Sequence, residues 1–489
     1  MKKATIFVNI SILLALFMGL LFVGCIKKPV GQKTSYIISI DYDGENTISG
    51  CENVCYVNNT DNALSFLQFN LFANAFQDKD AVVTVIEEDR AYYNGFNEGK
   101  IEISSVESDG EKLEFSFDGD NNEIMKVLLV NEIYPDEKIN IEIEFTLTLA
   151  DINHRLGRGK ETVNLGNFYP ILSVYENGKG FYKNIYQPFG DPFYSQVASY
   201  QAEISYPQEF NVASSGIKQN ESKGDKCKTI FKGENMRDFA LVLSKNFDSI
   251  SVKNSACEIE YYGYHGDTNI KQCLQVAQDA VTYFSKTFGN YPYKKLSVVK
   301  NSFVQGGMEY PSLVMISDEV DNDNLNYVIV HEVAHQWWYG VVGNNQYETA
   351  WLDEGLAEQS TLMFFRDITK YNVNFKERLQ SCYDSYKLYQ KVQQKVYGKV
   401  DEVMDKSLDK FSSSPDYVAM AYTKSTLMLS TLEETLGKSK FNACLKGMYK
   451  DFSFKEMSKA DFIAYFSTKS HRNLEPFFKS WLDGEVVIA

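Results

Sequence analysis

Two histidines four residues apart, His331 and His335, are the residues whose types and spacing most clearly predict chemistry. They belong to the sequence His331-Glu332-Val333-Ala334-His335, the H-E-x-x-H pattern. Residues four apart lie on one face of an α-helix, so both imidazoles can be directed at one point. That geometry suits a tetrahedral zinc ion, and Glu332 is placed to act on a water beside the metal. The pattern therefore predicts a zinc site with a glutamate general base.

A third metal ligand is predicted from the segment that follows. Glycines and asparagines between residues 340 and 345 interrupt the helical pattern, and a second helical run begins near Leu352. This run carries Glu354, and eighteen residues separate it from His335, so a turn can bring its carboxylate back to the metal. Three protein ligands leave the fourth position of a tetrahedral zinc ion open for water, as in catalytic sites. We expect one zinc ion per chain, held by His331, His335 and Glu354.

The H-E-x-x-H pattern also arises by chance on charged helices that bind no metal. Against that alternative, the chain has only five histidines, and two of them belong to the pattern. The surrounding residues are mostly apolar, which predicts a buried helix. Two unpaired imidazoles and a carboxylate are costly in such a place without a metal or hydrogen-bond partners. These observations favour a catalytic zinc site.

Around these residues the sequence resembles the aminopeptidase N family of zinc metallopeptidases, which are gluzincins. The matching segments are HEVAHQWW, which begins at His331, and WLDEGLAE, which contains Glu354. Asp353 stands in the second segment where the family more often has asparagine. The resemblance implies a short bacterial, membrane-tethered member that removes N-terminal residues from peptides with the help of zinc and the general base Glu332.

A third matching segment lies upstream of the predicted zinc helix. Gly306-Gly307-Met308-Glu309-Tyr310 resembles the family motif G-x-M-E-N, with tyrosine in place of asparagine. The resemblance implies that Glu309 binds the free α-ammonium group of the substrate, while Gly306 and Gly307 allow its backbone to approach closely. Alternatively, Glu309 is an ordinary surface glutamate. The family's second anchor for the amine, which comes from the β-domain, has no clear match in this sequence.

Two further residues have weaker sequence signals. The family stabilises the oxyanion with a tyrosine followed by x-K-G, and Tyr422-Thr423-Lys424-Ser425 is the best match, which implies that Tyr422 is catalytic. The alternative is that Tyr422 only packs at the start of a helix. Glu358 lies one turn after Glu354 and can support a zinc-binding histidine, or it can be a solvated helix residue.

The first 24 residues form a predicted targeting segment. Lys2 and Lys3 precede an apolar run that ends at Gly24-Cys25. The sequence around Cys25 resembles a bacterial lipobox, in which the cysteine is lipidated and becomes the new N-terminus. The apolar run is also long enough to remain uncleaved as a membrane anchor. Both interpretations place the protein on the extracytoplasmic face of the cell membrane, attached through residues 25–33 as a tether.

The rest of the chain divides into two predicted domains with an α+β organisation. Residues 34–250 contain short runs typical of strands, and in residues 139–149 apolar and polar residues alternate strictly. Similar runs occur at 36–42, 82–87, 100–104, 112–117 and 125–130. These patterns predict an N-terminal antiparallel β-sandwich-like domain. Residues 251–489 are mainly helical with a small sheet, and by resemblance they form a thermolysin-like catalytic domain.

Composition limits the remaining possibilities. A chain of 489 residues is long enough for two or three domains of about 150 residues each. The net charge of −16 argues against a nucleic-acid partner, because the overall field repels phosphate. Beyond Cys25 there are seven cysteines, so at least one thiol must be free in an exported protein. Cys51 and Cys55 could pair locally, although isolated buried thiols are the simpler interpretation.

Three functions are compatible with these observations. The first is a zinc aminopeptidase acting on peptides outside the cytoplasmic membrane. The second is a zinc endopeptidase or oligopeptidase on the same scaffold, suggested by the missing second amine anchor. The third is a surface lipoprotein that binds peptides without turnover. The preferred side chain, the physiological substrate and the oligomeric state do not follow from the sequence.

Overall fold

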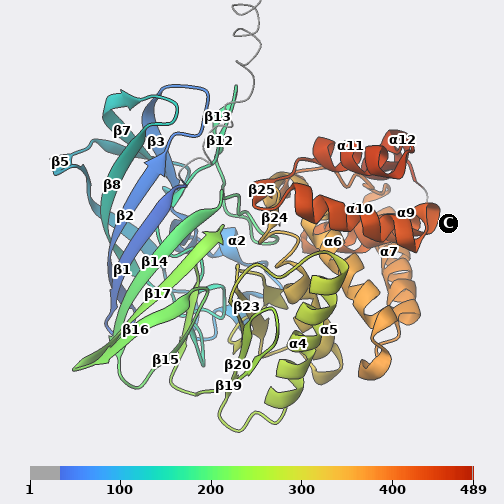
Figure 1. Ribbon diagram of the computed structural model, residues 1–489, viewed down its shortest axis with the longest axis horizontal. Helices are drawn as coiled ribbons and strands as arrows, with labels where there is room; N and C mark the ends of the chain where they lie inside the picture. Colours follow the sequence, from blue (N-terminus) through green and yellow to red (C-terminus); the bar gives the residue numbers. More distant parts are fainter. Residues whose placement is uncertain (1–32, 487, 489) are drawn as a thin grey trace, which may run out of the picture. The chain divides into compact units, whose positions relative to one another are not determined.

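The computed structural model of the chain describes residues 33–486 and residue 488 (Figure 1). The predicted targeting segment 1–24, the predicted lipidation site Cys25 and the tether up to residue 32 lie outside the described residues. Thr34–Ala489 forms one compact unit. Within the part of the chain that the structure describes, no helix has the length and apolar character needed to span a membrane.

The first half of the described chain is built mainly of β-sheets, the largest with the strand order β16-β17-β14-β1-β2-β8-β4-β5. Neighbouring strands in this sheet are antiparallel except for β1 and β14, which run parallel. The strands are β1 Ser35–Tyr42, β2 Thr47–Val57, β4 Lys100–Ser108, β5 Glu111–Lys112, β8 Lys138–Thr148, β14 Ala198–Pro207, β16 Ile217–Lys223 and β17 Lys226–Met236.

The alternation in residues 139–149 explains one of these strands. In β8, Ile141, Ile143 and Phe145 are buried, whereas Glu142 and Glu144 between them are exposed. Successive side chains of a strand point to opposite faces of its sheet, so one face of β8 enters the core. The strand predicted from this pattern is confirmed.

Two four-stranded sheets complete the β-rich half. Their orders are β15-β18-β10-β9 and β11-β3-β7-β6. Their strands are β3 Leu64–Asn70, β6 Phe115–Asp118, β7 Ile124–Ile133, β9 Leu156–Arg158, β10 Val163–Leu165, β11 Ile171–Leu172, β15 Asn211–Ser214 and β18 Leu241–Ser244. A β-hairpin of β12 Tyr175–Glu176 and β13 Gly180–Phe181 lies beside them. The predicted β-rich first domain is therefore present, with several sheets.

Two predicted strands are wrong in detail. Residues 82–87 form the end of helix α2 (Lys79–Val82) and a turn before α3 (Glu88–Ala91). The Asp78 side chain accepts a hydrogen bond from the Asp80 backbone N–H and caps α2, while Val85 and Ile86 are exposed and pair with no strand. Residues 112–117 are divided between two sheets, because β5 pairs with β4 and β6 pairs with β7.

The second half contains a five-stranded sheet and a set of helices, which Figure 1 shows on the right. The sheet has the order β19-β20-β21-β23-β22, and β19 runs across the predicted domain boundary between residues 250 and 251. Its strands are β19 Phe247–Lys253, β20 Glu258–Tyr264, β21 Lys295–Asn301, β22 Gly307–Met308 and β23 Leu313–Ser317.

The longer helices of this half are α4 Ile270–Thr287, α5 Asn322–Ala334, α6 Gln346–Asp367, α7 Phe375–Tyr397, α9 Ser425–Leu436, α10 Lys438–Asp451, α11 Lys459–Ser470 and α12 Glu475–Leu482. Two short strands, β24 Val342–Gly343 and β25 Lys455–Glu456, pair in parallel. α9 stops at Gly437, and a reciprocal capping box of Ser458 and Asp461 opens α11.

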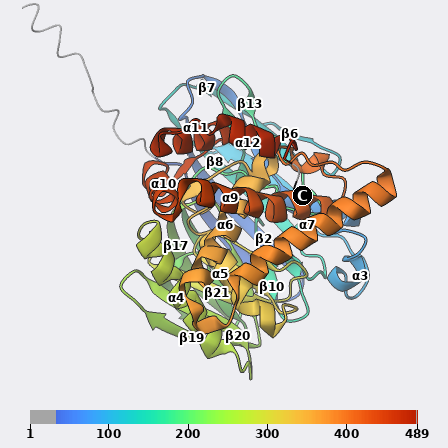
Figure 2. The same cartoon turned by 90° about the vertical axis from the view of Figure 1, so that its right-hand side faces the viewer.

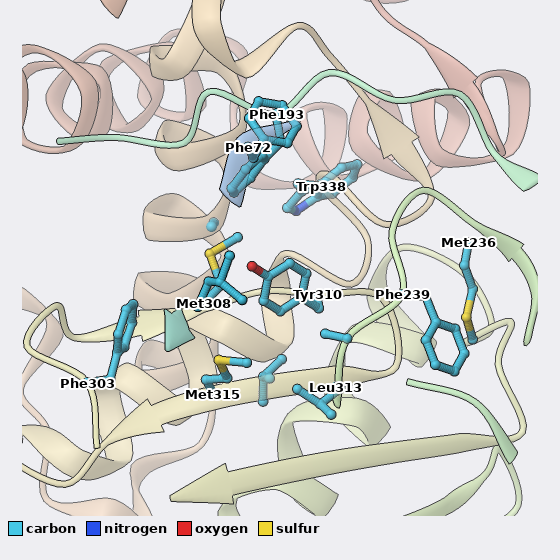
Figure 3. Packing of buried hydrophobic residues seen from close by; sticks show 14 of the residues in the cluster. Phe72, Phe193, Met236, Phe239, Phe303, Met308, Tyr310, Leu313, Met315 and Trp338 are labelled. Carbon is cyan, nitrogen blue, oxygen red and sulfur yellow. The ribbon is translucent and has the colours of Figure 1, made fainter. Parts of the chain in front are cut away.

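The two halves share one buried hydrophobic cluster. Figure 3 shows it with Phe72 and Phe193 from the first half and Met308, Tyr310 and Trp338 from the second. The Tyr310 hydroxyl, which stands where the related motif has asparagine, donates a hydrogen bond of 2.7 Å to the side-chain oxygen of Asn167. This tyrosine therefore fastens the β22–β23 connection to the β-rich half.

A buried arginine at the end of β17 makes a second connection between the halves. Arg237 donates from Nε to the Tyr339 carbonyl at 2.8 Å and from Nη1 to the Glu456 carboxylate at 2.9 Å. Its Nη2 donates to the Lys455 carbonyl at 2.9 Å. A Cβ atom at Gly343 would lie 2.2 Å from the guanidinium carbon, so only glycine leaves room for this arginine.

The seven cysteines of the described residues are all free. Cys51 and Cys55 lie four residues apart in the same strand, β2. Four residues of a strand span about 13 Å, far beyond the reach of a disulfide. The local pairing considered from the sequence is therefore wrong.

Candidate active site

Three buried side chains from α5 and α6 point their donor atoms at one another. The Nε2 atoms of His331 and His335 are 3.0 Å apart, and Oε2 of Glu354 lies 3.2 Å and 3.3 Å from them. Tetrahedral zinc with bonds of about 2.0 Å places its ligand atoms about 3.3 Å apart. The donor set, its spacing and its burial therefore fit a zinc ion, and the sequence-predicted ligands are brought together.

Local structure explains why these donors meet. α5 is capped by Asp321, whose side chain accepts hydrogen bonds from the backbone N–H groups of Asp323 and Asn324. α6 begins at Gln346, earlier than the start predicted near Leu352, and it is broken at Thr349, whose φ and ψ are −139° and 48°. The regular helix that carries Glu354 resumes after this kink, close to the predicted position.

Buried neighbours restrain both imidazoles in the orientation that a metal requires. Nδ1 of His331 lies 3.0 Å from a carboxylate oxygen of Glu358, and Nδ1 of His335 lies 3.0 Å from the Trp338 carbonyl oxygen. The Tyr327 hydroxyl donates to the other Glu358 oxygen at 2.6 Å. A proton at Nδ1 of His335, donated to the Trp338 carbonyl, leaves its Nε2 lone pair free to bind metal. Glu358 is therefore packed against His331 and is not a solvated helix residue.

Glu332 lies beside this group and against Gly307. A Cβ atom at position 307 would be 2.3 Å from Oε1 of Glu332, so this close approach requires glycine. Burial raises the pKa of Glu332 to about 7, although the charges of His331 and His335 oppose the rise. A carboxylate with a pKa close to neutral is well suited to exchange protons near pH 7.

Tyr422 reaches the group from the far end of the chain. Its hydroxyl donates to Oε1 of Glu354 at 2.5 Å, and its ring stacks on His331 with 6.0 Å between centroids. Tyr422 lies inside the π-helical segment η4 (Val418–Lys424) rather than at a regular helix start. In a π-helix, residues five apart share a face, which brings Tyr417 to the same side.

Glu309 follows edge strand β22 and is only 3% exposed, so the alternative of a surface glutamate is wrong. Its Oε1 accepts a hydrogen bond of 2.7 Å from Nε2 of Gln346. Gln346 also donates to Asp353 at 2.7 Å, which gives this aspartate a partner. Donor atoms of Glu309, His335 and Asp353 lie within 4.8 Å of one another, so Glu309 borders the metal site.

A cavity of about 570 Å³ opens onto these residues. Among the predicted site residues, it is lined by Gly306, Gly307, His331, Glu332 and Tyr422. The buried donors His335, Glu354 and Glu309 lie behind this lining.

Four charged residues of the cavity wall, Glu87, Arg155, Asp191 and Arg378, were missed from the sequence. Asp191 and Arg155 come from the β-rich half and form a buried ion pair, and Arg378 comes from α7. Asp191 belongs to the segment Gly190-Asp191-Pro192, where a charge between glycine and proline was the available signal. Arg155 and Arg378 follow no motif or spacing that could have identified them.

Comparisons with known proteins show what this chain resembles. The peptidase family M1 domain matches residues 272–481. Aminopeptidase 2, mitochondrial, of Saccharomyces cerevisiae is 23% identical over 57% of this chain and 30% of its own length. Human glutamyl aminopeptidase is 22% identical over 60% of this chain and 32% of its own length. The chain thus spans about a third of the length of these curated relatives.

The fold has counterparts among solved structures. The M1 zinc metallopeptidase from Deinococcus radiodurans superposes with a TM-score of 0.64 over 94% of each chain, at 15% sequence identity. At this identity the likeness concerns the fold. The matched domain, however, includes the two histidines, the glutamate and the tyrosine described above. Over residues 272–481, which hold the site described above, this chain is therefore similar to the zinc metallopeptidases of peptidase family M1.

Proposed function

We propose that this protein is a zinc aminopeptidase that hydrolyses N-terminal residues from peptides. The observation that carries the proposal is the triangle of His331, His335 and Glu354 donor atoms beside Glu332, on a cavity that also exposes Gly306 and Gly307. A metal site with three protein ligands and an adjoining carboxylate is suited to metal-dependent peptide hydrolysis.

Each residue has a distinct part in the reaction. Zinc bound by the three ligands supplies Lewis-acid activation of water and of the scissile carbonyl. The Glu332 carboxylate accepts the proton of the attacking water and then returns it to the leaving amine. The Tyr422 hydroxyl turns from Glu354 to the substrate and donates a hydrogen bond to the oxyanion. Glu358 and the Trp338 carbonyl keep the two imidazoles in place.

Exopeptidase specificity comes from acidic groups at one end of the cavity. Glu309, buried behind the cavity lining, binds the substrate's α-ammonium group, and Asp191 of the lining, which is ion-paired with Arg155, supplies the second acidic group that the sequence did not identify. A buried anion fixes where a free amine can dock and thereby limits how far a peptide enters. A structure of the Deinococcus radiodurans relative holds a Tyr-Ser-Ala substrate, which supports a peptide substrate for this chain.

The location we propose is the extracytoplasmic face of the cell membrane, with Cys25 lipidated or the preceding apolar segment retained as an anchor. The support is the lipobox-like sequence that ends at Cys25. Metabolic labelling with a fatty-acid analogue tests it, because Cys25→Ser removes the label if this cysteine carries the lipid. Labelling that persists in the variant would contradict the assignment.

The activity is tested with one peptide in two forms, free and N-acetylated. The full chain, purified in detergent with zinc, is followed by mass spectrometry over time. We expect stepwise loss of residues from the free form and no change in the acetylated form, because only the free form offers an ammonium group. Internal cleavage of both forms would favour an endopeptidase, and absence of any cleavage would favour peptide binding without turnover.

A further inference from the structure

One wall of the cavity is formed by α7, the long helix that Figure 2 shows crossing the helical half of the molecule. Arg378, Ser381, Cys382 and Ser385 of this helix line the cavity. These residues recur every three to four positions, so they lie on one face of α7. This face therefore belongs to the same cavity as the predicted catalytic groups, and Arg378 is its only charged member.

Arg378 differs from the other arginine of the cavity. Arg155 is ion-paired with Asp191. Arg378 forms no ion pair with a carboxylate of the described residues, and its Nη2 donates to the Asn324 side-chain oxygen at 2.7 Å. Its guanidinium carbon lies 4.8 Å from the centre of the Tyr327 ring, which holds the group flat. A guanidinium has five N–H donors, so most of them are available to a ligand.

The charges of the cavity define a direction along α5. At the C-terminal end of the helix, Gln336 donates to the backbone carbonyl of Tyr310, which follows Glu309 directly, so the acidic anchor lies at that end. Arg378 contacts Asn324 and Tyr327, which lie in the N-terminal half of α5. The acidic anchor and Arg378 therefore lie toward opposite ends of α5, and Glu358, which also lines the cavity, accepts the Tyr327 hydroxyl bond beside Arg378.

The distances match the length of a short substrate. His331 lies seven residues after Asn324, which corresponds to about 10 Å along the helix axis. An extended peptide advances about 3.4 Å per residue, so two or three residues beyond the cleaved bond span about 7 to 10 Å. The C-terminal carboxylate of a tripeptide or tetrapeptide therefore reaches the region of Arg378 when its first residue is at the site.

We propose that Arg378 binds the C-terminal carboxylate of the substrate and so makes this protein selective for tripeptides and tetrapeptides with a free C-terminus. Guanidinium and carboxylate groups form two parallel charge-assisted hydrogen bonds, which fixes the position of the peptide as well as its charge. Stacking on Tyr327 prepares the guanidinium for this contact. The inference deepens the proposed aminopeptidase function and rests on it.

The test compares trialanine with its C-terminal amide on the zinc-loaded full chain. We expect the wild type to prefer the free acid by roughly tenfold in kcat/KM, mainly through KM, because the amide offers no charge. Arg378→Gln should bring the two substrates within about twofold by raising KM for the acid, and Arg378→Lys should retain part of the preference. Equal rates for acid and amide in the wild type would overturn the proposal.

The matched control is Lys376→Gln, which removes one positive charge from the exposed side of the same helix without touching the cavity. It should leave the preference unchanged, and an equal loss in this variant would mean that net charge, not contact, causes the effect. Hexaalanine gives a check without any variant. Its carboxylate passes beyond Arg378, so its acid and amide forms should react alike, and a retained tenfold preference would contradict the inference.

Failure of the two proposals can be distinguished. If neither form of the peptide is hydrolysed, the proposed function has failed, and binding still decides the role of Arg378. Calorimetry on the zinc-loaded Glu332→Gln variant then compares the affinities of trialanine and its amide. Tighter binding of the acid by roughly tenfold, lost on adding Arg378→Gln, supports the carboxylate site. Equal affinities reject it.

Discussion

Two buried glutamates, one in each half of the molecule, differ in their hydrogen-bond partners and in the direction of their pKa shifts. Glu52 in β2 is 0% exposed, and neither of its carboxylate oxygens has a hydrogen-bond partner among the described residues. Burial therefore raises its pKa well above the usual value. Glu354 in α6 is 3% exposed, yet its contacts with His331 and His335 outweigh the effect of burial and lower its pKa to about 2.

The difference in pKa between the two glutamates comes from their neighbouring side chains and not from their depth of burial. Glu52 pairs in register with Ile38 and Ile143 on the adjoining strands, which offer no side-chain donor. Glu354 faces two imidazoles and the Tyr422 hydroxyl. A buried carboxylate without a partner is held neutral, whereas one surrounded by donors stays charged and can bind a cation. The β-rich half thus tolerates a buried carboxylic acid without a partner, Glu52. The helical half instead surrounds its buried acid, Glu354, with donors.

The largest effect is expected from Glu332→Gln, which removes the carboxylate that neighbours the donor triangle. We expect kcat to fall roughly a thousandfold, because an amide cannot accept the proton of the attacking water. The zinc content, measured by atomic absorption, should remain one per chain, because the three ligands are intact. Asp323→Asn, the same type of change on the exposed start of α5, should leave kcat unchanged. Full activity in Glu332→Gln would remove this residue from the mechanism.

The second prediction concerns the hydroxyl that donates to Glu354. Tyr422→Phe keeps the ring that stacks on His331 and removes only the donor, so kcat should fall roughly a hundredfold while KM changes little. Steady-state kinetics on a free peptide measure both constants. Tyr397→Phe on the exposed end of α7 is the control and should behave as wild type. A loss confined to KM would assign Tyr422 to substrate binding instead.

The third prediction weakens the support of one imidazole. Glu358→Gln replaces the carboxylate 3.0 Å from Nδ1 of His331, which should reduce zinc affinity roughly tenfold. Competition with a chelator measures the dissociation constant for zinc. Glu434→Gln on the exposed face of α9 makes the same chemical change away from the site and should have no effect. An unchanged affinity in Glu358→Gln would show that the Glu358 contact does not tune the metal.

The donor group of His331, His335 and Glu354 was far easier to predict from sequence than the rest of the cavity. His331, His335 and Glu354 follow from helical spacing and one return turn, and the strand at residues 139–149 follows from alternation. Both rules act within a single element or across one connection. They require no knowledge of how distant segments pack.

The remaining features depend on packing between distant segments. Arg155, Asp191 and Arg378 come from segments far apart in sequence, and only the fold places them on one cavity. The β-branched run at residues 82–87 has the composition of a strand, but Asp78 caps a helix there and no strand is available to pair with it. Glu52 could not be recognised either, because a polar residue in an alternating strand is normally assigned to the exposed face.

The smallest effect is expected for Glu52, and it concerns stability. Because its folded pKa is raised, the folded state holds a proton that the unfolded state releases above about pH 4.5, so the free energy of unfolding falls as pH rises from there. Glu52→Gln cannot ionise and lacks this dependence. We expect it to be close to wild type in stability at pH 5 and more stable at pH 8, by about 1.4 kcal/mol for each pH unit between the unfolded and folded pKa of Glu52.

Urea unfolding at pH 5 and pH 8 measures this difference, because other titrating groups are common to both proteins and cancel. Glu142→Gln on the exposed face of the neighbouring strand β8 removes the same charge in solvent and should show no pH-dependent gain. If Glu52→Gln and wild type lose stability in parallel between the two pH values, the Glu52 carboxylate must find a donor when it ionises. The contrast with Glu354 would then be one of degree, since both halves would supply partners to a buried acid.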